Sequence, residues 1–294
     1  MTERPFFVCL CPTYGRPRMV QNAVACFLAQ DYPVDRRRLL ILDDAGQIPA
    51  QKGDGWEVFS MSERFESLPA KYAELLRLAT QLTRTVQCYA DVADEQGTIT
   101  DSWVQEIEEP MLPDAYAVWD DDDIYLPWHL SAHAEILGEH GWSHPSKVWS
   151  TYTGKPELEN AAGRFHGALA VRRDLMERIG GWPETLRADF DQRMIWRLAD
   201  EEPPGDPTTV AVPSYVFRWG ATRHPHCQGF MKSPDNTSWY HDYARAHRFE
   251  PWGELASGLD ADTVATMAAI EAIRRRQYAA DDVVETLLDT FGTM

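Results

Sequence analysis

The sequence is poor in basic residues. Lysine and arginine total 28 against 46 aspartates and glutamates, which gives a formal net charge of −18 over 294 residues. A surface with this balance repels phosphate backbones, so the composition disfavours nucleic-acid binding driven by charge. This composition does not exclude a local basic patch on an otherwise acidic surface. The simplest interpretation of the negative charge is that it keeps the protein soluble.

Long apolar runs and paired cysteines are also absent. The first apolar run, Phe6–Cys11, is far shorter than the ~20 residues of a membrane-spanning helix and too short for a signal peptide. The five cysteines include no Cys-Xaa-Xaa-Cys pair, and Cys9 and Cys11 fall on one face of a strand, where they cannot bridge comfortably. We therefore expect a cytoplasmic protein with buried thiols and no membrane contact.

The sequence does contain an alternation of strand-like and helix-like segments. Short apolar runs predict buried strands, and apolar residues at helical spacing predict helices. This β-α-β-α order predicts an α/β fold with a mostly parallel, doubly wound sheet flanked by helices. The predicted strands of the first half are Phe6–Cys11, Arg38–Leu42, Trp56–Ser60 and Ala115–Trp119, and the predicted helices are Met19–Gln30 and Leu68–Leu82.

The second half continues this pattern after an interruption. Residues 84–113 are polar and acidic and predict an insertion of loops with one short helix. Residues 1–255 are expected to form one domain, and residues 256–294 a C-terminal helical extension that packs on it or on a partner chain, which would make a homo-oligomer. The remaining predicted strands are Val148–Tyr152, Ala168–Val171 and Val210–Phe217, and the remaining predicted helices run from Pro127 to about Gly138, over Arg173–Ile179 and over 191–199.

Polar residues follow three of the predicted strands. They are Pro12–Arg16, Asp43–Asp44 and Asp120–Asp123. Each signal alone is weak, because a turn, a helix cap or a solvated acidic loop would explain it. In an open parallel sheet, however, ligands bind at the carboxyl ends of the strands, and three such ends in order indicate a site.

Adjacent carboxylates repel one another, and a hard divalent cation offsets that repulsion. Oxygen-only ligation suits Mn²⁺ or Mg²⁺, which keep water and substrate phosphate as further ligands. A diphosphate leaving group is the natural partner of such a metal. The run Asp120–Asp123 therefore predicts a metal and diphosphate site.

With these residues the sequence resembles the inverting glycosyltransferases of family 2, which have the GT-A fold. The resemblance covers roughly residues 5–230 and is specific for the fold and the class of donor, but it says nothing of the acceptor. The segments that carry it are 8–16, 40–44, Lys71, 119–127, 167–173 and 180–183, followed by Arg197-Leu198.

The resemblance implies roles on the donor side. Asp122 would be the direct metal ligand, and Asp120 would face the ribose and the metal, as the two acids of the family's Asp-Xaa-Asp motif. Asp44 would bind the base, typically uracil, with Asp43 beside it. Lys71 is expected near the base or the diphosphate, although taken alone it would be interpreted as a solvated lysine on a helix. The other residues assigned to the donor are Pro12, Thr13, Tyr14, Arg16 and Asp121.

The resemblance also implies a general base. The spacing to Arg197-Leu198 favours Asp191, with Asp189 as the rival, and either aspartate could instead cap a helix. Phe190 stands where the family has glutamate. His226 is expected to complete the metal shell, with a surface histidine as the alternative. Trp182 and His166 are assigned to the acceptor side, although Trp182 could equally belong to the core.

The expected activity is the transfer of a sugar, with inversion, from a nucleoside-diphosphate sugar to an acceptor hydroxyl. A UDP-sugar is the favoured donor. Two alternatives stay open at this point: a nucleotidyltransferase on an α/β fold, and a non-catalytic protein that binds sugar nucleotides, to which Phe190 lends some weight. The acceptor could be a glycan, a protein, a small molecule or a modified nucleic-acid base.

Overall fold

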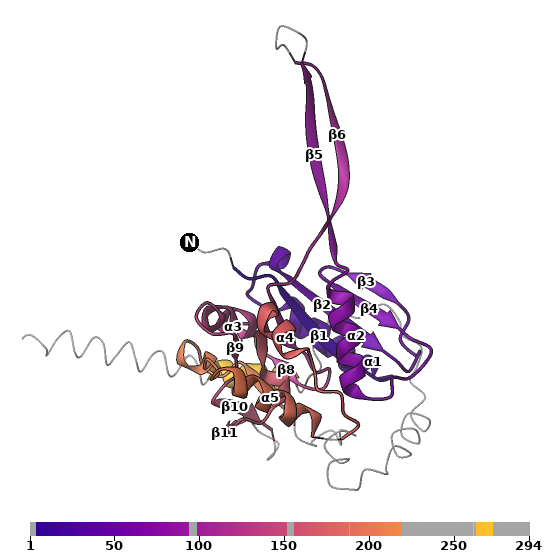
Figure 1. Cartoon of the computed structure of the whole chain (residues 1–294). Helices are drawn as coiled ribbons and strands as arrows, with labels where there is room; N and C mark the ends of the chain where they lie inside the picture. The colour runs from indigo at the N-terminus through magenta and orange to yellow at the C-terminus, as the bar shows by residue number, and fades with distance from the viewer. Residues whose placement is uncertain are drawn as a thin grey trace, which may run out of the picture.

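The computed structural model describes residues 4–93, 99–151, 156–187, 189–218, 261 and 263–272. Within these ranges, the main sheet has seven strands in the order β3-β4-β2-β1-β7-β12-β9 (Figure 1). Strands β4, β2, β1 and β7 are parallel, and β3 and β12 run antiparallel to their neighbours. The bounds are β1 Phe7–Thr13, β2 Arg37–Asp43, β3 Gln51–Gly53, β4 Trp56–Ser60, β7 Ala115–Val118, β9 Trp142–Ser143 and β12 Ala170–Arg172.

Strand β1 lies at the centre of the core and contacts both of its layers. All seven of its residues are buried, and successive side chains point to opposite faces of the sheet. Cys9 and Cys11 therefore lie in one apolar cluster, and Val8 and Leu10 lie in the other. The two cysteines are free and share a face, as the sequence predicted.

Helices cover both faces of the sheet. Helices α1 (Pro17–Leu28) and α3 (His129–Leu137) pack in the cluster that contains Cys9, whereas α2 (Leu68–Ala79), α4 (Arg173–Ile179) and α5 (Phe190–Glu201) pack in the other. Their ends follow the sequence, since Pro17 opens α1 and Gly180, at φ +74°, closes α4. Short 3₁₀ turns occupy η1 Val34–Arg36, η2 His166–Ala168 and η3 Pro207–Thr209. The predicted doubly wound α/β fold is confirmed.

The strand order reverses at β1. The chain proceeds outward from β1 to β2 and β4, and later returns to place β7 on the other side of β1. Ligands of open parallel sheets bind at the carboxyl ends of the strands flanking such a reversal. Thr13 ends β1, and the run Asp120–Asp123 follows β7, so both lie at this point.

A smaller sheet positions the exit of the aspartate run. Its order is β11-β10-β13-β8, with bounds β11 Glu157–Asn160, β10 Lys147–Ser150, β13 Tyr215–Phe217 and β8 Ile124–Tyr125. Strand β8 begins directly after Asp123 and pairs with β13, with Tyr125 opposite Tyr215. The predicted strand Val210–Phe217 is too long, because residues 210–214 form a loop and only Tyr215–Phe217 pair. Pro213, within that loop, has no amide to donate to a sheet.

The predicted insertion of loops is wrong. Strands β5 (Thr83–Ala93) and β6 (Ile99–Pro110) pair antiparallel as the two arms of a long hairpin, which projects from the body of the molecule (Figure 1). The alternation that produces it is visible in Val86 and Cys88 opposite Ile107 and Gln105, but the many acidic residues hide it. The hairpin joins the body at the edge of the sheet where β1 and β7 begin. Asp114, shortly after β6, donates its amide to the Phe6 carbonyl, just before β1, at 2.9 Å.

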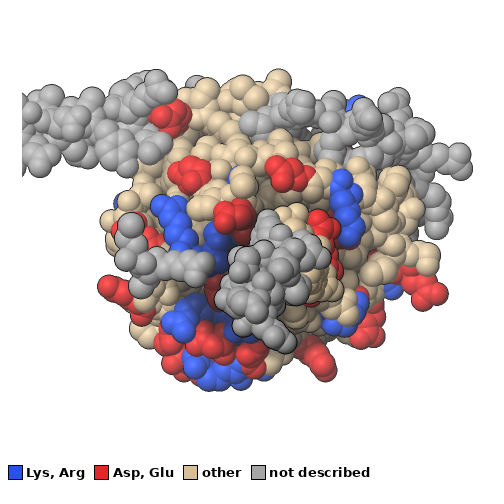
Figure 2. Space-filling model, turned by 90° about the horizontal axis from the view of Figure 1, so that it is seen from above, with Lys and Arg blue, Asp and Glu red and all other residues tan. Residues whose placement is uncertain are grey.

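The face from which the hairpin projects carries acidic and basic side chains intermixed (Figure 2). On this view the described residues form no broad basic surface of the kind that binds nucleic-acid backbones.

At the C-terminal end, residues 263–272 are helical. Ile270 is fully buried and Met267 packs against the same apolar cluster as α1, so this segment contacts the domain. The remainder of the predicted extension lies outside the described residues, so its predicted role in a homo-oligomer stays a prediction. None of the helices in the described part of the chain is both long and apolar enough to span a membrane.

Candidate functional site at the carboxyl ends of β1, β2 and β7

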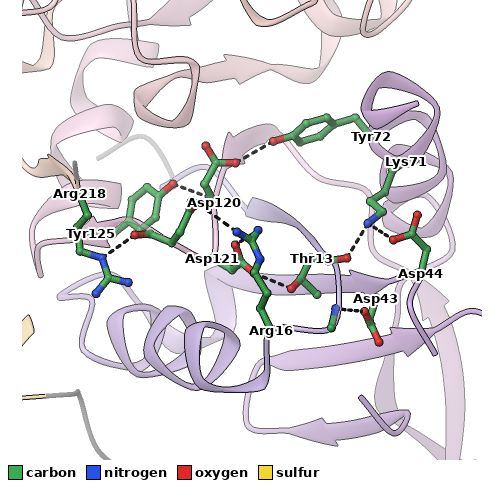
Figure 3. Close-up of polar contacts among 12 residues, drawn as sticks. Thr13, Arg16, Asp43, Asp44, Lys71, Tyr72, Asp120, Asp121, Tyr125 and Arg218 are labelled. Atoms are coloured by element: carbon green, nitrogen blue, oxygen red, sulfur yellow. Dashed lines mark hydrogen bonds and ion pairs between the residues drawn. The ribbon is translucent and has the colours of Figure 1, made fainter. Parts of the chain in front are cut away.

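The ends of β1 and β7 are tied together by side chains. The Thr13 hydroxyl donates a hydrogen bond to Asp121 Oδ2 at 2.5 Å (Figure 3). Arg16, in the loop after β1, forms an ion pair with Asp121 and reaches Asp122 Oδ2 with Nη1 at 3.2 Å. The predicted convergence of these two strand ends is therefore present.

The four aspartates alternate between inward and outward positions. Asp121 and Asp123 are buried, and each has protein partners on both carboxylate oxygens: Thr13 and Arg16 hold Asp121, and Tyr215 and the Arg218 amide hold Asp123. Asp120 and Asp122 are instead half-buried, and 14% of the Asp122 side chain is exposed. Asp120 and Asp122 are therefore the members of the run that can face a ligand.

The charges of this run are incompletely balanced. Burial, followed by the charge of Asp122, raises the pKa of Asp120 to about 7. Burial also raises the pKa of Asp121 to about 6, although the Arg16 guanidinium opposes the rise. A bound cation would relieve the repulsion between Asp120 and Asp122.

Asp120 and Asp122 fit a particular kind of metal site. Among the described residues, no group of three or more acidic, histidine or cysteine side chains could hold a metal ion by itself. Mg²⁺ is commonly held by one or two carboxylates, with phosphate and water supplying the other ligands. The pair therefore suits a metal that arrives with a diphosphate. His226, predicted to complete the shell, lies outside the described residues.

Asp120 is held in place from several sides. Its amide donates to the Tyr125 hydroxyl at 2.6 Å, and the Tyr72 hydroxyl donates to its Oδ1 at 3.1 Å. Its Oδ2 lies against Gly167, where a Cβ atom would come within 2.6 Å of it. Gly167 is thus required by close approach, not by an unusual backbone angle.

The end of β2 contributes an ion pair. Lys71, on α2, is buried; it pairs with Asp44 and donates to the Thr13 carbonyl at 2.6 Å. Burial lowers the pKa of Lys71, and the charge of Asp44 opposes that shift. Lys71 is thus not a solvated lysine but joins the ends of β1 and β2 (Figure 3).

Asp43 has a different environment from Asp44. Its Oδ1 accepts the amides of Gly15 and Ala45 at 2.8 and 3.2 Å, and its Oδ2 accepts those of Gln47 and Ile48, both at 3.0 Å. The side chain is fully buried. Its oxygens are therefore engaged in fixing the two loops, whereas Asp44 pairs with Lys71 through Oδ1 and accepts the Phe65 amide with Oδ2 at 3.0 Å.

Pro12 and Tyr14, which the resemblance assigns to the nucleotide, lie at the end of β1. Pro12 pairs in register with Leu42 of β2. The Tyr14 ring lies beneath the Arg64 guanidinium, 4.7 Å from its carbon to the ring centroid. Both therefore lie at the same strand end as Thr13.

Trp182 and His166 belong to one aromatic cluster with Tyr72. The Trp182 indole nitrogen donates to His166 Nε2 at 2.7 Å, and its ring stacks on Tyr72 with centroids 4.3 Å apart. Both side chains are buried, and Trp182 packs in the same apolar core cluster as Tyr72, as the core alternative expected. Phe190, at the start of α5, contacts His166 and Tyr72.

The two candidate bases lie at the start of α5 in different electrostatic settings. Asp189 precedes the helix and forms ion pairs with Arg187 and Arg193 at 3.2 and 3.1 Å, and the Arg193 hydrogen bond lowers its pKa. Asp191 has no such pair within the described residues, and burial raises its pKa. The Asp189 side chain makes no helix-capping hydrogen bond, whereas Asp191 Oδ1 accepts the amide of Gln192, in the first turn of α5, at 2.7 Å.

Four residues of the site were not identified from the sequence. Tyr72, Tyr125, Tyr215 and Arg218 hold three of the four aspartates or their backbone. Only the last two carried a signal, because they belong to a Tyr-Xaa-Xaa-Arg-Trp segment, 215–219, that overlaps the end of the predicted strand Val210–Phe217. The tyrosine hydroxyls gave none, since buried tyrosines are common in any core.

Comparison with known proteins supports the fold. No protein-family profile matches the chain, and no curated protein sequence matches it. A mannosyltransferase from Pyrobaculum calidifontis, in complex with GDP-Man and Mn²⁺, is similar to it at a TM-score of 0.50 and 17% identity, covering 99% of this chain and 82% of that one.

Residues 1–349 of S. aureus TarS, in complex with UDP-GlcNAc, are similar at a TM-score of 0.51 and 13% identity, covering 82% of this chain and 65% of that one. The same fragment in complex with UDP gives 0.50 and 12%, covering 72% and 60%. At these identities the likeness concerns the fold, and the chain has the GT-A-like α/β fold expected from its sequence.

Proposed function

We propose that this chain is a metal-dependent glycosyltransferase that moves a sugar from a nucleoside-diphosphate sugar to an acceptor hydroxyl with inversion at the anomeric carbon. The observation that carries the proposal is the meeting of Thr13, the Asp44–Lys71 pair and the Asp120–Asp123 run at the carboxyl ends of three adjacent parallel strands. This is the place in such a sheet where nucleotides bind.

The donor would lie along this edge in a fixed order. Pro12, Thr13, Tyr14 and Asp44 would line the nucleotide, and Lys71 and Arg16 would supply the positive charge that a diphosphate requires. Asp122 would hold Mn²⁺ or Mg²⁺ directly, with Asp120 beside it. The metal would offset the negative charge that develops on the departing diphosphate.

Asp191 is the proposed general base. A carboxylate accepts a proton best when its pKa is raised toward neutrality, and burial raises that of Asp191, whereas Arg193 and Arg187 lower that of Asp189. Phe190 places the start of α5 against the cluster of Tyr72 and His166 that adjoins Asp120. The acceptor oxygen would attack the anomeric carbon as its proton passes to Asp191, and the bond to the diphosphate would break.

The solved structures of the same fold favour a sugar nucleotide as the donor, but they do not decide which nucleoside it contains. One of them contains GDP-Man with Mn²⁺, and another contains UDP-GlcNAc. UDP remains the preferred nucleotide here, because Asp44 matches the family's uracil-binding acid.

The proposal is tested by thermal unfolding of the full chain with UDP, GDP and their sugar conjugates, each with Mn²⁺ and with chelator. A ligand at a hundred times its dissociation constant adds about 2.7 kcal/mol to the free energy of unfolding. We expect that gain for a nucleoside diphosphate only when Mn²⁺ is present. Equal stabilisation in chelator would show that the aspartate run does not hold the diphosphate.

The products separate this proposal from its alternatives. A glycosyltransferase releases nucleoside diphosphate from the donor, whereas a nucleotidyltransferase would release or consume pyrophosphate. Slow hydrolysis of the sugar donor without acceptor would exclude a purely non-catalytic role. Absence of both products with every donor that stabilises the protein would favour the binding role.

A further inference from the structure

Tyr72 is the residue through which α2 reaches the aspartate run. It follows Lys71 on the helix, and the two adjacent side chains diverge: Lys71 reaches the ends of β1 and β2, and Tyr72 reaches Asp120 after β7 (Figure 3). The Tyr72 hydroxyl donates to Asp120 Oδ1 at 3.1 Å. One turn of a helix therefore contacts all three strand ends of the site.

The ring of Tyr72 leaves its hydroxyl little freedom. The residue is fully buried; its ring stacks on Trp182 at 4.3 Å with an interplanar angle of 8°, and the His166 ring lies at 78° to it with centroids 5.4 Å apart. Trp182 is itself fixed by its 2.7 Å hydrogen bond to His166. A buried ring packed on two sides keeps its hydroxyl oriented, which a solvent-exposed tyrosine does not do.

The other contacts of Asp120 leave its carboxylate dependent on Tyr72. Tyr125 holds only the backbone amide, and Gly167 limits the space around Oδ2 without donating a hydrogen bond to it. We propose that Tyr72 is a positioning residue that fixes the Asp120 carboxylate for the metal-bound donor, and that it thereby links the metal site to the aromatic cluster of Trp182 and His166. This inference rests on the proposed function.

The test is the affinity of the full chain for Mn²⁺ with UDP or GDP present, whichever stabilises the wild type. It is measured from the electron paramagnetic resonance signal of free Mn²⁺. Tyr72→Phe keeps the ring and removes only the hydroxyl. Because residues that orient a metal-binding carboxylate typically contribute 10- to 100-fold in metal affinity, we expect the apparent dissociation constant for Mn²⁺ to rise about tenfold or more.

Tyr116 supplies the matched control. It is buried in the same apolar cluster, and its hydroxyl makes no hydrogen bond within the described residues. We expect Tyr116→Phe to bind Mn²⁺ as the wild type does. The expected loss on Tyr72→Phe must also disappear when Asp120 is already asparagine, because the hydroxyl then has no carboxylate to orient.

The outcomes separate the inference from the function on which it rests. Mn²⁺ affinity of Tyr72→Phe within twofold of wild type, an equal loss in Tyr116→Phe, or an undiminished loss in the Asp120→Asn background would each overturn the positioning role while leaving the glycosyltransferase proposal intact. If the wild type failed to bind Mn²⁺ in the presence of either UDP or GDP, both the positioning role and the glycosyltransferase proposal would be overturned. Circular dichroism and thermal unfolding of each variant verify that the chain is folded.

Discussion

Lys71 Nζ lies 2.6 Å from the carbonyl oxygen of Thr13, a residue 58 positions earlier in the chain, and it also pairs with Asp44. Both charged side chains are at least 94% buried, with exposures of 6% and 3%. Breaking a buried pair by removing one partner leaves an uncompensated charge, which is strongly destabilising. The pair therefore supports the fold as well as the proposed site.

We expect Lys71→Met to lower the free energy of unfolding by about 3–5 kcal/mol, because Asp44 is then buried without a counter-charge. The double variant Lys71→Met with Asp44→Asn should recover much of that loss. Urea unfolding of the two single variants and the double variant measures the coupling. Additive losses would show that the two groups do not stabilise each other.

The second prediction concerns two neighbouring aspartates with different partners. Asp122→Asn should weaken Mn²⁺-dependent donor binding and turnover together while leaving the protein folded, because Asp122 is partly accessible. Asp121→Asn should instead lower stability, since it removes the buried charge that Arg16 pairs with. Thermal unfolding without ligand, followed by nucleotide titration with Mn²⁺, separates the two effects. Identical behaviour would contradict the alternation along the run.

The third prediction concerns Gly167→Ala. The added Cβ would lie 2.6 Å from Asp120 Oδ2 and 2.7 Å from the Tyr215 hydroxyl, which is closer than carbon and oxygen can approach. We expect weaker Mn²⁺-dependent nucleotide binding, because Asp120 must move. Gly163→Ala is a suitable comparison for general loop effects, since nothing lies within 4 Å of its Cβ, although its φ of +70° also costs some stability. Unchanged nucleotide affinity in Gly167→Ala would show that Asp120 has room to shift.

The sequence predicted the parts of this site that depend on strand ends. Apolar runs ending in polar residues placed Thr13, Asp44 and Asp122 at one edge of the sheet, because parallel strands present their carboxyl ends together. The sequence did not reveal that Lys71 is buried or that Tyr72 reaches Asp120. Those contacts depend on how α2 packs over β1 and β2, and a helical lysine has the same local pattern whether it is solvated or buried.

The hairpin was missed for a different reason. Its strands β5 and β6 alternate as strands must, but a two-stranded ribbon in solvent has no buried face to make that alternation apolar on one side. Acidic residues such as Glu106 and Glu108 therefore gave a pattern typical of loops. The residue types alone therefore could not distinguish a solvent-exposed hairpin from a loop.

The hairpin gives the fourth prediction. It leaves the sheet where β1 begins, at the edge opposite Thr13 and Asp120. Replacing residues 86–107 with Asn-Gly, which forms a tight two-residue turn, should therefore leave Mn²⁺-dependent nucleotide binding within about twofold of the full chain. Nucleotide titration of the shortened protein checks this. A large loss of affinity in a folded variant would place the hairpin in contact with the donor.

The last prediction distinguishes Asp191 from Asp189. Asp191→Asn should abolish transfer but leave nucleotide affinity nearly unchanged, because the amide is almost the same size and cannot accept the acceptor's proton. Positioned general bases contribute about 10² to 10⁴ in rate. Asp189→Asn should retain most of its activity, since Asp189 is paired with Arg187 and Arg193.

The pH dependence of kcat, measured with donor and Mn²⁺ saturating so that the bound metal keeps Asp120 ionised, gives a further check on the same residue. Burial raises the pKa of Asp191 above the ordinary aspartate value of 3.8, and a base acts only when deprotonated. Activity should therefore fall as the pH is lowered through a pKa above 3.8, whereas a base at Asp189 would lose activity only below 3.8, because its arginine partners lower its pKa. An inactive Asp189→Asn beside an active Asp191→Asn would move the base by two residues. If both variants turned over normally, neither aspartate would be the base, and the acceptor's proton would have to leave by another group.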